Sequence, residues 1–216
     1  MEESTQREKV LKRIRNALIH KTNNPFPDLD FESNIYKEMD DSPEVVFAEE
    51  FIKVSGNFVY CESEREFVEN LKALMTDNQW VNVFCMEDKV KQILTEGHIP
   101  FLSEEDNMHD IEAGITSCEF LIARLGSIMV SSGQQCGRRM FVYPPVHIVL
   151  AYASQLVPDL KHALAGIKQK YSDKIPSMIS VITGPSRTAD IEKTLVMGAH
   201  GPKNVFVFFI DDTVCD

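Results

Sequence analysis

Apolar and polar positions alternate along residues 43–210 with the two periods that mark strands and helices. Short apolar runs predict strands at 58–61, 81–85, 99–102, 147–152, 177–183 and 204–210. Helical spacing and capping signals between them predict helices at about 43–55, 63–75, 87–95, 158–171 and 188–197. Two further apolar runs, 119–123 and 127–131, flank Gly126 and predict a hairpin. Strands that alternate with helices are joined by parallel crossovers, so the pattern predicts a wound α/β sheet.

The first 50 residues follow a different pattern. Over residues 5–20 apolar side chains share one helical face and basic side chains fill the others, which predicts an amphipathic helix that ends before Pro25 and Pro27. Such a helix packs on its own domain or on a sister subunit, or it binds a membrane or a partner protein. Residues 28–50 contain nine acidic residues and one basic residue, which predicts a solvated connector. We therefore expect an N-terminal part, 1–44, and an α/β domain, 45–216.

Composition narrows the class of protein. With 216 residues, of which 44% are hydrophobic and 25% charged, the chain can bury one sizeable core. A net charge of -11 argues against nucleic acid as a partner and against a broad attraction to anionic lipid, so a small anionic ligand has to be held locally. We see neither a signal segment nor a long apolar run, and expect a cytoplasmic chain without a membrane span.

The cysteines give no sign of a metal or redox centre. No CxxC pair or zinc-like spacing is formed by Cys61, Cys85, Cys118, Cys136 and Cys215. We therefore expect no metal and no cofactor, and reduced thiols in a cytosolic protein. Cys136 alone stands in a glycine-containing loop, where it is either buried or, if neighbouring arginines lower its pKa, reactive.

The segment SVITGPSRTADIEKTLVMG carries the strongest sign of a ligand site, because an apolar strand passes through a Gly-Pro turn into the polar start of a predicted helix. Unpaired N–H groups at a helix N-terminus attract anions. The candidates for holding a phosphate or a carboxylate are Gly184, Ser186, Arg187 and Thr188. Asp190 and Glu192 are the candidate catalytic residues for proton transfer. The plainer alternative is a capped helix in which these polar residues only stabilise the first turn.

A second loop, SSGQQCGRRM, follows the predicted hairpin. Gly133 allows a ligand to approach the backbone, and Arg138 with Arg139 offers a pair of cationic donors. Gly133 and Arg138 are therefore further substrate-binding candidates. Adjacent arginines are also often solvated or paired with acids, and that alternative stays open.

Two histidines are weaker candidates. His200, in the AHGP turn, is a possible acid or base, but a right-handed crossover would put this turn at the opposite edge of the sheet from Ser186, roughly 15 Å away across a helix of about ten residues. We therefore assign His200 to a turn or an interface. His147, at the start of a strand, is expected to be a hydrogen-bonded, partly buried side chain.

The stretch ITGPSRTADIEKTLVMGAHGPKNVFVFFI, together with GIT, SGQQCGRR and VHIVL upstream, resembles the lactate-utilisation (LUD) domain family, of the lactate utilisation protein C type, over about residues 45–210. The resemblance implies a three-layer, Rossmann-like α/β fold similar to ribose-5-phosphate isomerase, glucosamine-6-phosphate deaminase and CoA transferases. It also implies a complex that oxidises L-lactate to pyruvate, in which iron–sulfur partner subunits carry the redox centres and this chain has a non-redox role.

The chain departs from the family pattern at two places. Arg124 stands where the family has an acidic residue in E-T-G-T, so carboxylate chemistry is not expected at that position. The second loop carries Gln134, Gln135 and Cys136 in place of further glycines, so the ligand can differ from that of a typical member.

Three functions remain open at this point. The first is a non-redox subunit of a lactate-oxidising complex that binds a small anionic ligand or a partner surface through the two loops. The second is a stand-alone isomerase or transferase in which Arg187 and Arg138 bind an anionic substrate and Asp190 or Glu192 moves a proton. The third is a non-catalytic binding module that docks a partner through the basic helix. A homo-oligomer is compatible with all three.

Overall fold

The computed structural model describes residues 5–19, 25–30, 39–104, 111–189 and 195–212. The chain divides into two compact units, Met1–Glu38 and Met39–Asp216, which are described one at a time. The helices are α1 (Gln6–Ile19), α2 (Pro43–Lys53), α3 (Glu64–Asp77), α4 (Asp88–Glu96) and α5 (Leu160–Tyr171). Within these described ranges, no helix is long and apolar enough to cross a membrane.

The first unit contains α1, which confirms the helix predicted over 5–20. Its N-terminus is closed by a capping box: the backbone N–H of Thr5 donates to the Glu8 carboxylate at 2.8 Å, and the backbone N–H of Glu8 donates to Thr5 Oγ1 at 3.3 Å. The described residues of this unit bury no side chain of α1. Its apolar face is therefore not covered from within the unit.

The second unit is built on a parallel sheet of six strands in the order β1-β12-β7-β4-β2-β3. These strands are β1 (Asn57–Cys61), β2 (Val83–Cys85), β3 (Phe101–Leu102), β4 (Ala113–Thr116), β7 (Val146–Tyr152) and β12 (Asn204–Ile210). In the register of the sheet, Phe208 of β12 lies between Val59 of β1 and Leu150 of β7. The α/β class with a parallel central sheet is confirmed.

A second sheet of four strands, in the order β8-β5-β6-β9, lies beside the first. Its strands are β5 (Phe120–Ile122), β6 (Ser127–Ser131), β8 (Leu156–Val157) and β9 (Ile179–Ile182). Antiparallel pairing of β5 with β6 confirms the predicted hairpin. The strand predicted at 177–183 forms as β9, but it pairs with β6 and is half-exposed instead of lying buried in the parallel sheet.

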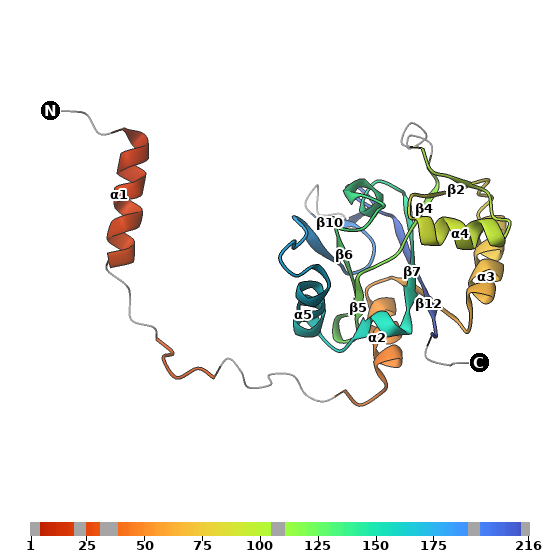
Figure 1. Ribbon diagram of the computed structural model, residues 1–216, viewed down its shortest axis with the longest axis horizontal. Coiled ribbons are helices and arrows are strands. Elements are labelled where there is room, and N and C mark those ends of the chain that lie inside the picture. The colour runs from red at the N-terminus through yellow and green to blue at the C-terminus, as the bar shows by residue number, and fades with distance from the viewer. Residues whose placement is uncertain (1–4, 20–24, 31–38, 105–110, 190–194, 213–216) are drawn as a thin grey trace. The chain divides into compact units, whose positions relative to one another are not determined.

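Within the second unit, the two sheets and the helices α2 to α5 stack in layers (Figure 1). One face of the parallel sheet packs against α3 and α4 through Phe67, Leu71 and Leu94. The other face packs against α2 and the second sheet, where Phe47 and Phe51 meet side chains of β5, β6 and β12. A small third cluster places α5 on the outer face of the second sheet. Capping signals set two helix starts, since Ser63 accepts from the N–H of Glu66 and Asp159 accepts from the N–H of Lys161.

The helix predicted over 188–197 is wrong. Its described parts are two short strands, β10 (Arg187–Ala189) and β11 (Leu195–Met197), which pair antiparallel. β-branched Thr188 and Val196 stand opposite each other in this pair, and β-branched residues favour strands. The N–H of Gly198 donates to the carbonyl of Ser186 at 2.9 Å. The described residues of this loop therefore offer no helix N-terminus to an anion.

Candidate functional site

Polar side chains gather at the carboxyl ends of two neighbouring strands of the parallel sheet. β2 ends at Cys85 and β4 at Thr116, so Glu87 and Ser117 follow adjacent strands. The N–H of Ser117 donates to Glu87 Oε2 at 2.9 Å, and Glu87 is buried. Open α/β sheets bind their ligands at this edge, because loops from several strands converge there.

The loop after β6, residues 132–139, is held against this edge by two glutamines. The Gln134 amide donates to the carbonyl of Ser117 at 2.9 Å, and its Oε1 accepts from the N–H of Ser131 at 2.9 Å. Gln135 exchanges hydrogen bonds with Asp88 at the start of α4, each at 3.1 Å. Gln134 and Gln135, which replace glycines of the family pattern, thus fix the loop to the segments that follow β4 and β2.

A buried carboxylate joins this loop to α5. Glu119 Oε1 accepts from Ser131 Oγ at 2.6 Å and from the Tyr171 hydroxyl at 2.7 Å, and its Oε2 accepts from Lys170 Nζ at 2.7 Å. Burial alone would raise the pKa of Glu119, but the hydrogen bonds from Lys170, Ser131 and Tyr171 outweigh it and lower that pKa. We call Glu87, Ser117, Glu119, Ser131, Gln134, Lys170 and Tyr171 the carboxyl-edge cluster.

The two α5 residues of the cluster keep their ordinary protonation at neutral pH. Burial lowers the pKa of Lys170, but the bond to Glu119 more than offsets this and the pKa is raised. Burial, and then the bond to Glu119, raises the pKa of Tyr171. Gly133 lies so close that a Cβ atom there would be 2.4 Å from the Tyr171 hydroxyl oxygen. The loop therefore packs tightly on a neutral tyrosine and a charged lysine.

Exposed donors form a rim beside the cluster. Arg138 begins the short 3₁₀ helix η3 (Arg138–Phe141), and its guanidinium donates to Ser177 Oγ. The hydroxyl oxygens of Ser177 and Ser132 are 3.4 Å apart. Arg139 turns away, with its guanidinium 5.6 Å from the centre of the Tyr143 ring. We call Ser132, Arg138 and Ser177 the serine–arginine rim.

The loop at Gly184 contacts a different part of the molecule. Arg187 donates to the carbonyl of Val54 and, at 2.8 Å, to Ser55 Oγ, in the turn between α2 and β1. Gly184 has φ +76°, and a Cβ atom there would be 2.3 Å from the carbonyl oxygen of Val54. This turn precedes β1, so the loop lies at the amino edge of the parallel sheet. Ligand binding by Gly184, Ser186, Arg187 and Thr188 stays a prediction, and Asp190 and Glu192 lie outside the described residues.

The two predicted loops do not share one site. Ser131, before the first loop, pairs with Ile179 at the start of β9, whereas Ile182 at its end leads to Gly184. Four strand residues separate the loops, a distance of roughly 13 Å at about 3.3 Å per residue. Gly133 and Arg138 are near the carboxyl-edge cluster, and Arg187 is not.

The predicted distance of roughly 15 Å between His200 and Ser186 rests on a helix between them, and the described residues of that segment are strands instead. The N–H of Ser186 donates to the carbonyl of Pro202 at 2.9 Å, so the AHGP turn packs directly on the Gly184 loop. Gly201 lies close to the Ser186 side chain. His200 itself is exposed. A role for it as an acid or base remains a prediction.

His147 is more deeply buried than expected. Its side chain is fully buried in β7, with Nε2 2.8 Å from Thr116 Oγ1. Its Nδ1 has no hydrogen-bond partner in the described part of the chain. Burial lowers its pKa to about 4, so the ring is neutral at physiological pH. It lies inside the core and can support the strand ends without contacting a ligand.

Of the two interpretations of Cys136, a reactive thiol or a buried one, the structure supports the buried one. Cys136 is 2% exposed. Burial, and then the nearby charge of Glu87, raises the pKa of the Cys136 thiol well above its usual range. A thiol in this state is a poor nucleophile. Among the described residues, no group of three or more His, Cys, Asp or Glu side chains is placed to bind a metal ion.

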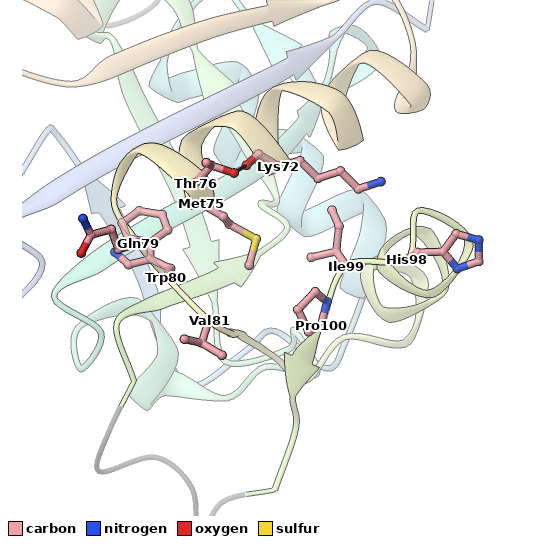
Figure 2. Close-up of a pocket in the computed structure, with 9 residues that line it drawn as sticks. All are labelled: Lys72, Met75, Thr76, Gln79, Trp80, Val81, His98, Ile99 and Pro100. Carbon is pink, nitrogen blue, oxygen red and sulfur yellow. Dashed lines mark hydrogen bonds between the residues drawn. The ribbon is translucent and has the colours of Figure 1, made fainter.

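A hollow of about 450 Å³ lies at the amino ends of β2 and β3, away from the carboxyl-edge cluster. Figure 2 shows Met75, Trp80, Val81 and Pro100 around it, with Lys72 at its rim. Of the predicted site residues that the structure describes, none lines this hollow. Its lining is mainly apolar, so it offers packing surface and few groups for chemistry.

The sequence interpretation missed Glu87 and Glu119. Glu87 was assigned to the start of a helix and Glu119 to a hairpin strand. One signal was available: Glu87 follows the VNVFC run and Ser117 follows GIT, and the ends of neighbouring parallel strands meet. Finding Glu119 required the pairing of β5 with β6 and the packing of α5, which a single sequence does not show.

The family profile described as the LUD domain matches residues 102–210, just over half of the 216-residue chain. A protein from Bacillus licheniformis called "Lactate utilization protein C" is 39% identical over 101 residues, covering 46% of this chain and 42% of that protein. Its namesake from Bacillus subtilis is 34% identical over 113 residues, covering 50% of this chain and 47% of the other. The chain thus matches less than half the length of these relatives.

A solved structure supports the fold. A DUF162 family protein from Deinococcus radiodurans superposes with a TM-score of 0.59 at 14% identity, covering 78% of this chain and 96% of the other. Ribose 5-phosphate isomerase A from Methanocaldococcus jannaschii superposes with a TM-score of 0.31, which is too low to support an argument. The matched span includes β4 to β12, and with them most of the carboxyl-edge cluster. The chain belongs to the LUD domain family.

Proposed function

We propose that this chain serves lactate utilisation as a cytoplasmic subunit without a redox centre of its own, and that it binds a small carboxylate anion at the serine–arginine rim. The observation that carries the proposal is the match of residues 102–210 to the LUD domain, together with relatives called lactate utilization protein C. That span includes the rim and every member of the carboxyl-edge cluster except Glu87.

The rim has the chemistry that a small hydroxy acid or keto acid needs. Lactate and pyruvate each carry one carboxylate and one oxygen on the next carbon. The Arg138 guanidinium can bind a carboxylate through two N–H groups, and the Ser132 and Ser177 hydroxyls can donate to, or accept from, the second oxygen. Lys170 is half-exposed, but its charge is balanced by the ion pair with Glu119, so Arg138 supplies the cation of the rim.

The carboxyl-edge cluster has a supporting role in this proposal. Glu119 and Gln134 direct their polar atoms toward neighbouring protein groups, so they fix the loop that presents Arg138. A loop held by several hydrogen bonds loses less conformational freedom when a ligand binds. The predicted proton-transfer step at Asp190 or Glu192 is not needed for this function.

The electron chemistry belongs to partners in this proposal. Oxidation of L-lactate to pyruvate releases two electrons and two protons, and the described thiols of this chain are buried with raised pKa values. We infer that iron–sulfur subunits accept the electrons, as the family resemblance implies. The chain then contributes ligand binding or assembly to the complex.

Lactate-dependent electron transfer tests the role of the chain. The complex is assembled from purified subunits with and without this chain, and reduction of an acceptor dye is followed after addition of L-lactate. We expect the rate to fall to background when this chain is omitted. An unchanged rate would show that lactate oxidation does not need it.

Thermal stabilisation of the purified chain by lactate and pyruvate tests the location of the site, since a ligand bound to the native state raises the melting temperature. Arg138→Ala should lose the shift. Arg187→Ala, which removes the same charge at the other loop, should keep it. The reverse result would place the ligand at Gly184–Thr188.

A further inference from the structure

The helix α1 is an isolated positive element in an acidic chain. Its 14 residues include five basic residues, Arg7, Lys9, Lys12, Arg13 and Arg15, and one acidic residue, Glu8. Its net charge is therefore +4, whereas the whole chain carries -11. Glu8 is already used in the capping box with Thr5, at the very start of the helix. The other side chains of the helix are cationic or apolar, apart from the neutral Gln6 and Asn16.

Five of the six apolar residues of α1 share one face, and Ile19 at the end of the helix lies on the opposite side. At 100° per residue, Val10, Leu11, Ile14, Ala17 and Leu18 fall within an arc of about 120°. Within the first unit their side chains are uncovered, with Ile14 51% and Leu18 65% exposed. The capping box starts the helix without help from tertiary contacts. The face is therefore preformed and available to a binding surface.

Cations border this face on both sides, and one further cation, Arg7 in the first turn, lies within the arc. Arg13 lies about 40° beyond one edge of the arc and Arg15 about 40° beyond the other, with Lys9 and Lys12 on the far side. This order suits the boundary of a lipid bilayer. Apolar side chains enter the acyl region there, while flanking arginines extend their long stems toward headgroup phosphates.

We propose that α1 is a membrane-surface anchor that binds anionic phospholipid bilayers, with its apolar face inserted and its arginines at the headgroups. Charge complementarity favours an anionic bilayer over a neutral one and over a second α1. A neutral bilayer would leave five cations without counter-charges, and pairing of two α1 helices would bring +4 against +4.

Vesicle sedimentation with the full-length chain tests the proposal. One set of vesicles is phosphatidylcholine alone, and the other contains a third phosphatidylglycerol. We expect binding to the anionic set only, weakened about tenfold or more between 50 and 500 mM salt because the attraction is screened. No sedimentation with anionic vesicles, or equal sedimentation with both sets, overturns the proposal.

A matched pair of variants separates insertion from charge alone. Ile14→Glu and Asn16→Glu change the net charge equally in the same helix, but only the first alters the apolar face. We expect Ile14→Glu to reduce binding at least tenfold and Asn16→Glu to reduce it only a few-fold. Equal losses overturn insertion. The alternative occupant is a second copy of this chain, and light scattering without vesicles measures the mass that reveals it. If the wild type is an oligomer that dissociates on Ile14→Glu and does not bind vesicles, the apolar face binds a second copy and the proposal is overturned.

Discussion

Replacement of Glu119 by Gln tests whether the buried carboxylate holds the loop and α5 together. The side chain is fully buried and accepts from Ser131, Lys170 and Tyr171 at 2.6–2.7 Å. Gln keeps an oxygen for the two hydroxyls but presents an NH₂ group to the Lys170 ammonium. A lost charge-assisted bond and an unsatisfied buried donor together cost about 2–4 kcal/mol of unfolding free energy. Urea unfolding followed by circular dichroism measures this.

A double-mutant cycle with Lys170→Met isolates the charged contact. Lys170 is 54% exposed, so solvent screening limits the loss from that single change to about 1–2 kcal/mol. The two changes together should cost less than the sum of the single changes by about 1 kcal/mol or more, since the new amide at position 119 no longer faces an ammonium. Losses that add within about 0.5 kcal/mol would falsify the direct coupling.

Acid titration gives the same carboxylate a second test. Its pKa is lowered in the folded state, so its contribution to stability is present above the unfolded value of 4.5 and is lost as pH falls through the folded value. Wild-type stability should therefore drop more steeply below pH 4.5 than that of Glu119→Gln. Identical slopes would mean that the pKa of Glu119 is the same in the folded and the unfolded protein.

Two further predictions concern the core and the Gly184 turn. The pKa of His147 is lowered to about 4 by burial, so the unfolded chain takes up the proton first and about 3 kcal/mol of stability is lost between pH 6.5 and 4. His147→Asn should remove that part of the pH dependence of the unfolding free energy. An unchanged slope between pH 6.5 and 4 would show that His147 does not cause it. Gly184→Ala should cost at least 3 kcal/mol in urea unfolding because the new methyl meets the Val54 carbonyl. Gly137→Ala, where φ is +71° and nothing lies within 4 Å, should cost only about 1 kcal/mol; equal losses would refute the close contact.

Elements with strong local signals were predictable from the sequence. The Ser63 cap, the Pro158–Asp159 helix start and the apolar run at 204–210 each form as expected, although the Glu66 carboxylate accepts from the N–H of Glu62 instead of that of Ser63. The structure of the segment after Gly184 was not predictable in this way, because helix caps and turns use the same Ser, Thr and Asp side chains. Long-range pairing decided between them: Gly198 bonds back to Ser186, and no local pattern encodes that contact.

The candidate site was predictable only in part. Gly133 and Arg138 were selected from loop chemistry and do lie beside the carboxyl-edge cluster. Arg187 was selected by the same reasoning, but β9 runs antiparallel in the second sheet and takes it to the other edge. The place of β9 in the second sheet therefore separates the two predicted loops, and ligand binding at Arg187 stays a prediction. The inward-facing Glu87 and Glu119 became visible only when several strand ends were brought together.

The position of β12 sets an order for folding during synthesis. β12 is the last strand in the sequence, yet it lies between β1 and β7, and β1 has no other strand partner in the described sheet. While the chain is being translated, β1 has to wait for residues 204–210 to leave the ribosome, more than 140 residues later. Until then it presents an unpaired apolar edge, which is a hazard for aggregation. Completion of the parallel sheet thus depends on residues 204–210.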